Sequence, residues 1–102
     1  MIDLEKGQEF LIGTSKDRGF GDPSVSPDGK RIACVLRSHG ANIPANLDIY
    51  TLDVDGSNLT QLTFHPGHDV CPRWSPDGNS IYFLSQRGSE KGEWNIWRMD
   101  VR

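Results

Sequence analysis

The sequence predicts an all-β protein built from two copies of one antiparallel sheet. Three observations predict it. The tetrapeptide Ser-Pro-Asp-Gly occurs at residues 26–29 and again at 75–78. Short runs rich in β-branched and aromatic residues follow each copy and are bounded by Gly, Asn and Asp, as is typical of strands. No stretch of the 102 residues keeps a helical periodicity.

The two copies share one register. Identical residues lie 49 positions apart in the pairs Thr14–Thr63, Pro23–Pro72 and Ile32–Ile81. The interval falls to 47 beyond the second strand of each copy, because the first copy has a longer loop, at 37–46, than the second copy has at 86–93. A repeat at such an interval indicates one supersecondary unit per copy.

Each copy begins with a hairpin. A short strand, Pro23–Ser26 or Pro72–Ser75, runs into the Ser-Pro-Asp-Gly turn. There, Pro fixes φ at the first corner and Gly supplies the left-handed conformation. The strand after the turn is Arg31–Leu36 in the first copy and Ser80–Ser85 in the second.

Further strands complete the copies. A third strand follows a loop, at Leu47–Val54 and at Trp94–Val101. After an Asp-Gly turn, the first copy has a fourth strand at Leu59–Phe64, and its counterpart by the repeat is Glu9–Thr14, near the N-terminus. The chain is therefore expected to have about eight strands.

The second strand of each copy is apolar on both faces. In Arg31–Leu36 the residues on one face are Ile32, Cys34 and Leu36, and those on the other are Ala33 and Val35. An antiparallel sheet with one wet face would alternate apolar and polar residues, so these sheets must be covered on both sides. Four-stranded antiparallel sheets stacked face to face in a ring meet this requirement, with about 40–50 residues per blade. The predicted fold is therefore a β-propeller made of four-stranded blades.

Two pairs of segments carry a family resemblance. "DPSVSPDGKRIACVL" with "LDIYTLDVDGSNLTQLT", and "CPRWSPDGNSIYFLS" with "WNIWRMDV", resemble the WD40-like (PD40) repeat of TolB-type propellers. They are also similar to the propeller domains of prolyl oligopeptidase-like and tricorn proteases. The first copy departs from the pattern at Val25, where Trp is typical, and at Gly13-Thr14, where Leu-Thr is typical.

The resemblance implies a domain organisation. Pro72–Ser75 would be an innermost strand and Leu59–Phe64 an outermost one. Residues 1–102 would form a single two-blade propeller segment: an N-terminal outermost strand and clasp at 1–14, a first blade at 22–64, and a second blade at 71–102 that lacks its outer strand.

The resemblance also implies how a ring closes. In family propellers the first strand completes the last blade, which a two-blade chain cannot do alone. We therefore expect this chain to bind itself, forming a six-bladed ring by homotrimerisation. The alternative is a piece of a longer propeller, which Ile2-Asp3-Leu4 favours because it resembles the end of a third strand.

Composition excludes several classes of partner. The formal charge of −3 and the absence of a Lys/Arg run argue against a nucleic-acid partner. No apolar run approaches the roughly 18 residues of a membrane span, and no basic segment precedes an apolar one at the start. We expect no membrane partner and a cytoplasmic protein, or a periplasmic one if a leader was removed. Cys34 and Cys71 lack CxxC spacing and are expected to be reduced and buried.

The candidate binding residues lie in the loops that join one blade to the next. The resemblance places these loops on one rim of the ring, beside the central channel, where propellers usually bind partners. The candidates are Lys16, Asp17, Arg18, Asp22, His65, His68, Asp69 and Arg73. "FHPGHDVC", at 64–71, contains zinc-ligand residue types. The first copy reads "SKDRGFGD" there, so we expect no metal and no cofactor.

The expected function is a non-catalytic interaction module that binds a protein, a peptide or a small ligand at the rim or central channel. No Gly-x-Ser-x-Gly segment is present, and Asp28 and Asp77 are expected to cap their own turns, so no catalytic residue is expected. One alternative is a fragment of a larger propeller in a prolyl oligopeptidase-like protease or another enzyme. Another is a structural or engineered repeat with no ligand.

Overall fold

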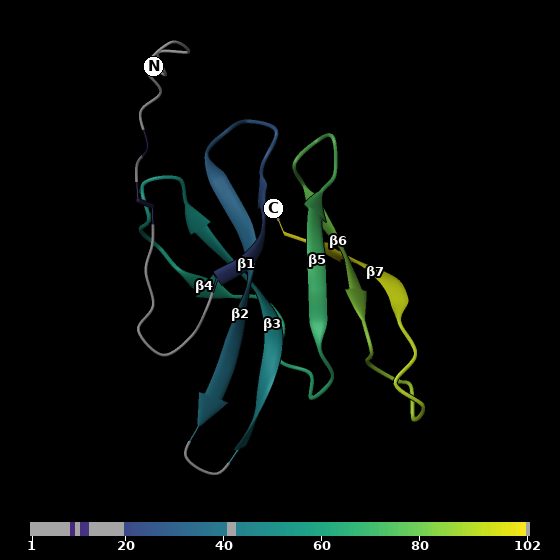
Figure 1. The fold of residues 1–102 in the computed structure, drawn as a ribbon. Coiled ribbons are helices and arrows are strands. Elements are labelled where there is room, and N and C mark those ends of the chain that lie inside the picture. Colours follow the sequence, from purple (N-terminus) through teal and green to yellow (C-terminus); the bar gives the residue numbers. More distant parts are fainter. Residues whose placement is uncertain (1–8, 10, 13–19, 41–42, 102) are drawn as a thin grey trace.

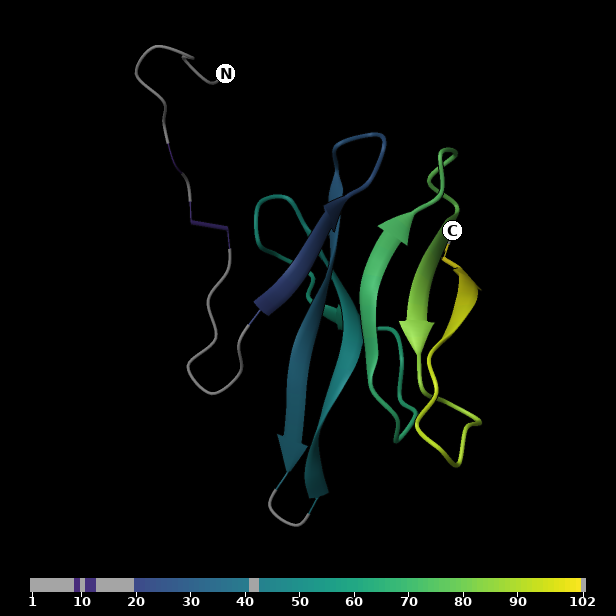
Figure 2. The same ribbon diagram turned by 45° about the vertical axis from the view of Figure 1, so that its right-hand side comes forward.

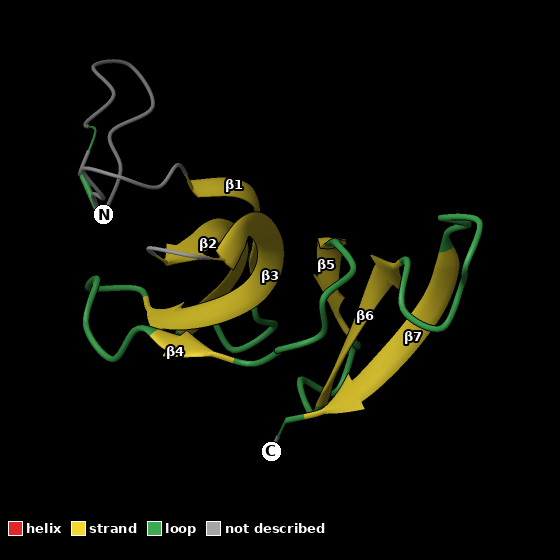
Figure 3. Cartoon of the chain, turned by 90° about the horizontal axis from the view of Figure 1, so that it is seen from below, coloured by secondary structure: helices red, strands yellow, loops and turns green. Residues whose placement is uncertain are grey.

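The computed structural model describes residues 9, 11–12, 20–40 and 43–101, and every regular element in them is a strand (Figures 1 and 3). The first sheet has the order β1-β2-β3-β4 and the second the order β5-β6-β7, with all neighbours antiparallel. The strands are β1 Phe20–Val25, β2 Arg31–Gly40, β3 Ile43–Asp53, β4 Thr60–Gln61, β5 Asp69–Trp74, β6 Ser80–Ser85 and β7 Asn95–Asp100. The prediction of an all-β protein with antiparallel sheets is confirmed. In the described part of the chain there is no helix long and apolar enough to cross a membrane.

The Ser-Pro-Asp-Gly turns have the same hydrogen bonds in both sheets. In the second turn Gly78 N donates to Ser75 O at 2.9 Å, and the Ser75 hydroxyl donates to Asp77 Oδ1 at 2.6 Å. Ser80 N then donates to Ser75 Oγ at 3.0 Å, which joins the turn to β6. Gly78 has a φ of 76°, the left-handed conformation that the turn requires. Local side-chain chemistry therefore sets both hairpins.

The first strand of each sheet carries a β-bulge. The register shifts between Gly21 and Ser24 in β1, and between Val70 and Arg73 in β5. Asp22 and Cys71 have φ values of 48° and 56°. The two residues are equivalent by the 49-residue interval, and each precedes a proline. Because Pro has no N–H to donate to the ladder, it is tolerated in a strand at such an irregularity. β1 and β5 continue through these bulges, so each strand begins three residues earlier than predicted.

The prediction of a loop at 37–46 is wrong, because most of these residues pair in the β2–β3 ladder. β2 and β3 continue their ladder through Arg37↔Leu47 and Ser38↔Asn46, and after an irregularity Gly40 pairs with Ile43. The hairpin therefore runs past the end of β6 (Figure 2). The equivalent segment of the second sheet, 86–94, forms turns instead.

The outermost strand of the first sheet is shorter than the predicted Leu59–Phe64. Beyond Gln61, Leu62 N still donates to Ile49 O at 2.8 Å, but Ile49 N donates to the Thr63 hydroxyl at 2.9 Å and not to a backbone carbonyl, so the regular ladder ends here. Of the predicted strand Glu9–Thr14, only Glu9, Leu11 and Ile12 lie in the described residues, and none of them is in a strand. The remainder of that predicted strand lies outside the described residues.

The two sheets pack face to face, with β5 lying along β1, β2 and β3 (Figure 3). The shared core consists of Ala33, Val35 and Ile49 from the first sheet with Ile81 and Phe83 from β6. Fully burying a large apolar side chain contributes about 1.5–3 kcal/mol to stability, so this cluster is a main source of cohesion between the sheets. The opposite face of the first sheet has a second buried cluster, of Cys34, Leu36, Tyr50 and Leu52. Both faces of the first sheet are therefore apolar and buried, as the alternation predicts.

Candidate binding rim

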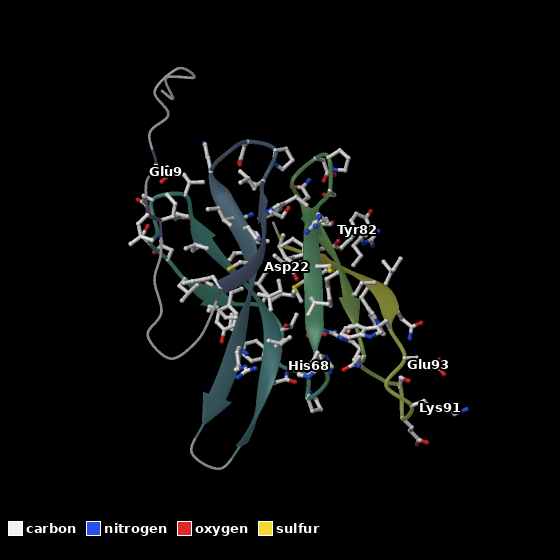
Figure 4. The ribbon with its side chains drawn as sticks, viewed as in Figure 1. Glu9, Asp22, His68, Tyr82, Lys91 and Glu93 are labelled. Atoms are coloured by element: carbon white, nitrogen blue, oxygen red, sulfur yellow. The ribbon has the colours of Figure 1, made fainter. Side chains whose placement is uncertain are left out.

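The predicted binding residues fall into two groups. Lys16, Asp17 and Arg18 lie outside the described residues. The structure places Asp22 at the bulge of β1, and Figure 4 labels it together with His68. The others are His65 and His68 in the loop between β4 and β5, and Asp69 and Arg73 in β5.

The loop between the sheets is held to the first sheet by side-chain hydrogen bonds. His68 Nδ1 accepts from Leu47 N at 3.2 Å, so the proton of the neutral imidazole lies on Nε2. Asn46 Nδ2 donates to His65 O at 2.7 Å and is 3.3 Å from Gly67 O. Residues 65–68 are therefore fixed by the start of β3, and the exposed side chain of His65 is presented from a supported backbone.

Asp69 forms a buried ion pair. Its side chain is fully buried, and Oδ2 lies 3.2 Å from Arg87 Nη2. Arg87 Nε also donates to Ser85 Oγ at 3.0 Å, and its guanidinium carbon lies 5.0 Å from the ring centre of Phe83 and 5.2 Å from that of Trp97. Asp69 therefore faces Arg87 rather than solvent, and within the described part of the chain its Oδ1 has no hydrogen-bond partner.

Sequence reasoning missed Arg87. It stands alone after β6 and has no motif, and its partner Asp69 is 18 residues away. The only signal was charge complementarity between the end of one strand and the start of its neighbour, which depends on the register Asp69↔Ser85. Arg73, by contrast, was predicted; it is exposed and donates from Nη1 to Pro72 O at 2.6 Å.

Two hollows lie beside β5 and the loop that precedes it. One, of about 400 Å³, lies where β1, β2 and β3 meet β5 and has an apolar lining of Phe20, Val35, Leu47 and Val70. The other, of about 440 Å³, lies between residues 65–67 and the loop after β6. The exposed side chains of Asp22 and Arg37 also line the first hollow, so it combines apolar surface with two opposite charges.

Neither cysteine takes part in a ligand cluster. Both thiols are free, and burial raises the pKa of Cys34 to about 11, so this thiol stays protonated at neutral pH. Among residues 9, 11–12, 20–40 and 43–101, no three His, Cys, Asp or Glu side chains are grouped as a metal site would require. His65, His68 and Cys71 therefore do not converge there, despite their closeness in sequence.

Comparisons with known proteins agree with this architecture. The family model described as "PD40: TolB beta propeller domain" matches residues 1–102. The structure is similar to TolB from Acinetobacter baumannii, with a TM-score of 0.77 and 32% identity over 97% of this chain and 23% of that one. The uncharacterized protein Atu1656 of Agrobacterium fabrum is 40% identical over 77 residues, which are 74% of this chain and 23% of that protein.

A peptidase is also among the relatives. Dipeptidyl-peptidase 5 of Porphyromonas endodontalis is 33% identical over 87 residues, which are 81% of this chain and 13% of that protein. The chain thus spans less than a quarter of the length of each relative named here.

Proposed function

Since this chain belongs to the TolB β-propeller (PD40) family, we propose that it is a non-catalytic interaction module that binds a peptide segment of a partner protein at its rim. The observation that carries the proposal is the hollow of about 400 Å³ between the ends of β1–β3 and β5. Ligand sites are usually concave, of roughly 300–1,000 Å³, and mostly apolar with a few placed polar groups.

The lining of the hollow suggests the chemistry of the ligand. Phe20, Leu47 and Val70 offer an apolar floor, which suits an apolar side chain. Asp22 and Arg37 provide one charge of each sign, which suits the polar groups of a peptide backbone or of flanking side chains. The hydrogen bonds of Asn46 and His68 hold the neighbouring loop in place, so binding costs less conformational entropy.

A peptide library on phage tests the proposal. Peptides selected on this chain should bind the Arg37→Glu variant at least about tenfold more weakly, because the substitution reverses the charge at the hollow. Arg98→Glu is the matched control, since Arg98 is exposed on β7 and is not among the residues that line the hollow. Selected peptides that bind both variants equally, or a library that yields no binder, would refute the proposal.

A larger protease is the second candidate. The similarity to dipeptidyl-peptidase 5 favours it, because the chain would then be part of the propeller of a longer peptidase and the rim would face another domain. The coding sequence around these 102 codons distinguishes the two candidates. A neighbouring α/β-hydrolase domain with a Gly-x-Ser-x-Gly segment would support the protease, and a frame without one would support the module.

A further inference from the structure

The exposed face of the second sheet is equivalent, by the repeat, to a face that is buried in the first. The residues of the first sheet that pack against the second sheet are Ala33, Val35, Leu47 and Ile49. Their equivalents, 49 or 47 positions later, are Tyr82, Leu84, Trp94 and Ile96, which we call the leading face. The strand register supports this equivalence, because Val35 pairs with Ile49 in the first sheet and Leu84 pairs with Ile96 in the second.

The leading face is largely uncovered in this chain. Ile96 is 75% exposed, Trp94 46% and Tyr82 42%, whereas Ala33 and Ile49 at the equivalent positions are at most 1% exposed. Tyr82 and Leu84 alternate with Ile81 and Phe83, which point into the shared core, so the leading face is the side of the sheet turned away from the first blade. A contiguous apolar surface of this kind marks an interaction site.

The chain also carries the complementary face. The residues of the first sheet that point away from the second sheet are Ile32, Cys34, Leu36, Tyr50 and Leu52, which we call the trailing face. Their equivalents in the second sheet are Ile81, Phe83, Ser85, Trp97 and Met99. Ile81, Phe83 and Met99 belong to the core shared by the two sheets. The contact between the sheets is therefore a leading-type face packed on a trailing-type face.

We propose that the leading face of one copy of this chain packs on the trailing face of a second copy, repeating between chains the contact seen within one. The interface is heterologous, because each copy uses a different face, so association continues until the ring closes. Propellers have about 4 to 8 blades, so two to four copies close a ring, and three copies give the six blades expected for this family.

The trailing face is exposed along β1, where Val25 is 58% and Phe20 37% exposed. The rest of it is covered in this chain, since Cys34, Leu36, Tyr50 and Leu52 are at most 5% exposed. A hollow of about 280 Å³ over this face is lined by Ile12 and Phe20 together with Ile32, Cys34 and Leu52. Ile12 is on the same chain and its carbonyl oxygen lies against Gly56. For a second copy to dock, Ile12 must leave this face.

The outer edge of β7 offers a further place for a strand of the second copy. In the first sheet the Thr63 hydroxyl accepts a hydrogen bond from Ile49 N, and the repeat equivalents of these residues are Thr14 and Ile96. Among the described residues β7 pairs only with β6, so its outer edge is unoccupied. In the assembled ring, we expect a strand of the second copy to pair with this edge, as β4 pairs with β3 in the first sheet.

Substitutions at exposed positions of the two faces test the interface without disturbing the fold of one chain. Ile96→Glu charges the leading face, and Val25→Glu charges the trailing face, because Val25 pairs with Ile32 and is 58% exposed. Phe64→Glu is the matched control, at a residue that is 73% exposed and belongs to neither face. In sedimentation velocity, Ile96→Glu and Val25→Glu should each weaken self-association at least about tenfold, and the control should behave as the unsubstituted chain.

Mixing the two variants tests the direction of the contact. The mixture retains one intact pair, the leading face of the Val25→Glu chain and the trailing face of the Ile96→Glu chain, so it should yield a complex of two chains. An unsubstituted chain that stays monomeric, or a mixture in which no complex forms, would overturn the proposal. Equal association of the Val25→Glu variant and the unsubstituted chain would also overturn it, since the leading face would then pair with itself.

Discussion

The indole Nε1 of Trp74 donates a hydrogen bond to the backbone carbonyl oxygen of Ser24, 50 residues earlier in the chain, at 2.9 Å. The guanidinium carbon of Arg31 lies 4.9 Å from the centre of the same indole ring. Trp74 thus joins β5 to β1 by a directional bond as well as by packing.

Removing the indole N–H should weaken the junction between the sheets. We expect Trp74→Phe to lower the free energy of unfolding by about 1 kcal/mol, the net contribution of one hydrogen bond. Urea denaturation measures the change. Trp97→Phe is the control, because Trp97 is 42% exposed and its ring also lies against an arginine, Arg87. Equal losses in the two variants would show that the bond to Ser24 contributes nothing.

Adding an indole at the equivalent position of the first sheet should strengthen the contact between copies. Val25 stands 49 positions before Trp74, and the equivalent of the Ser24 carbonyl is that of Arg73. We expect Val25→Trp to tighten self-association at least about tenfold, because the indole N–H of one copy then meets that carbonyl of the next. Analytical ultracentrifugation measures the effect. Val54→Trp, at a half-exposed residue beyond the end of β3, should leave the affinity unchanged.

Two ion pairs between described residues should differ in their contribution to stability. Arg87→Ala leaves the fully buried Asp69 carboxylate without its cation, and we expect a loss of about 3–5 kcal/mol. Arg98→Ala breaks the pair with Asp100, whose partners are 60% and 64% exposed, and should cost less than about 1 kcal/mol. Thermal unfolding of both variants is the measurement, and similar melting temperatures would contradict the structural role of Asp69.

Acid should weaken the Ser-Pro-Asp-Gly turns. The hydrogen bond from the Ser26 hydroxyl, followed by that from Lys30 N, lowers the pKa of Asp28 below its ordinary value of 3.8. The Ser75 hydroxyl and Asn79 N lower the pKa of Asp77 in the same way. Because the folded-state pKa lies below the unfolded one, the stabilisation is present above pH 3.8 and is lost as the pH falls through the folded-state value.

A double variant checks this prediction. Melting temperatures of Asp28→Asn/Asp77→Asn should fall less steeply between pH 4 and pH 2 than those of the unsubstituted chain, since Asn does not titrate. Asp22→Asn is the control, because Asp22 is exposed and lies in no such turn. A steep fall that persists in the double variant would show that other carboxylates govern acid unfolding.

The two thiols should react at different rates. Cys34 is 2% exposed and burial raises its pKa to about 11, so at pH 8 only about one in a thousand of these thiols is ionised. Cys71, in the bulge of β5, is less buried. A thiol reagent at pH 8 should therefore label at most one cysteine per native chain, and none in the Cys71→Ser variant. Rapid labelling of native Cys71→Ser would contradict the burial of Cys34.

Much of the fold could be predicted because local chemistry determines it. The Ser-Pro-Asp-Gly turns and the apolar residues on both faces of β2 and β6 are readable from neighbouring residues. The extension of the β2–β3 hairpin was missed, because Arg37, Ser38 and Asn46 have no strong strand preference and are paired only through their partners across the ladder.

The site was less predictable from the sequence, because it depends on contacts between residues far apart in the chain. The repeat identified the loop at 65–68, but the pairing of Asp69 with Arg87 depends on strand register and on burial. The bulges at Asp22 and Cys71 could have been found, since a proline inside a strand indicates an irregular ladder.

The mass of the unsubstituted chain in solution, measured by multi-angle light scattering, tests the pairing of leading and trailing faces most directly. We expect a single species with about three times the 11.4 kDa of one chain. A monodisperse species of 11.4 kDa at every concentration would contradict it.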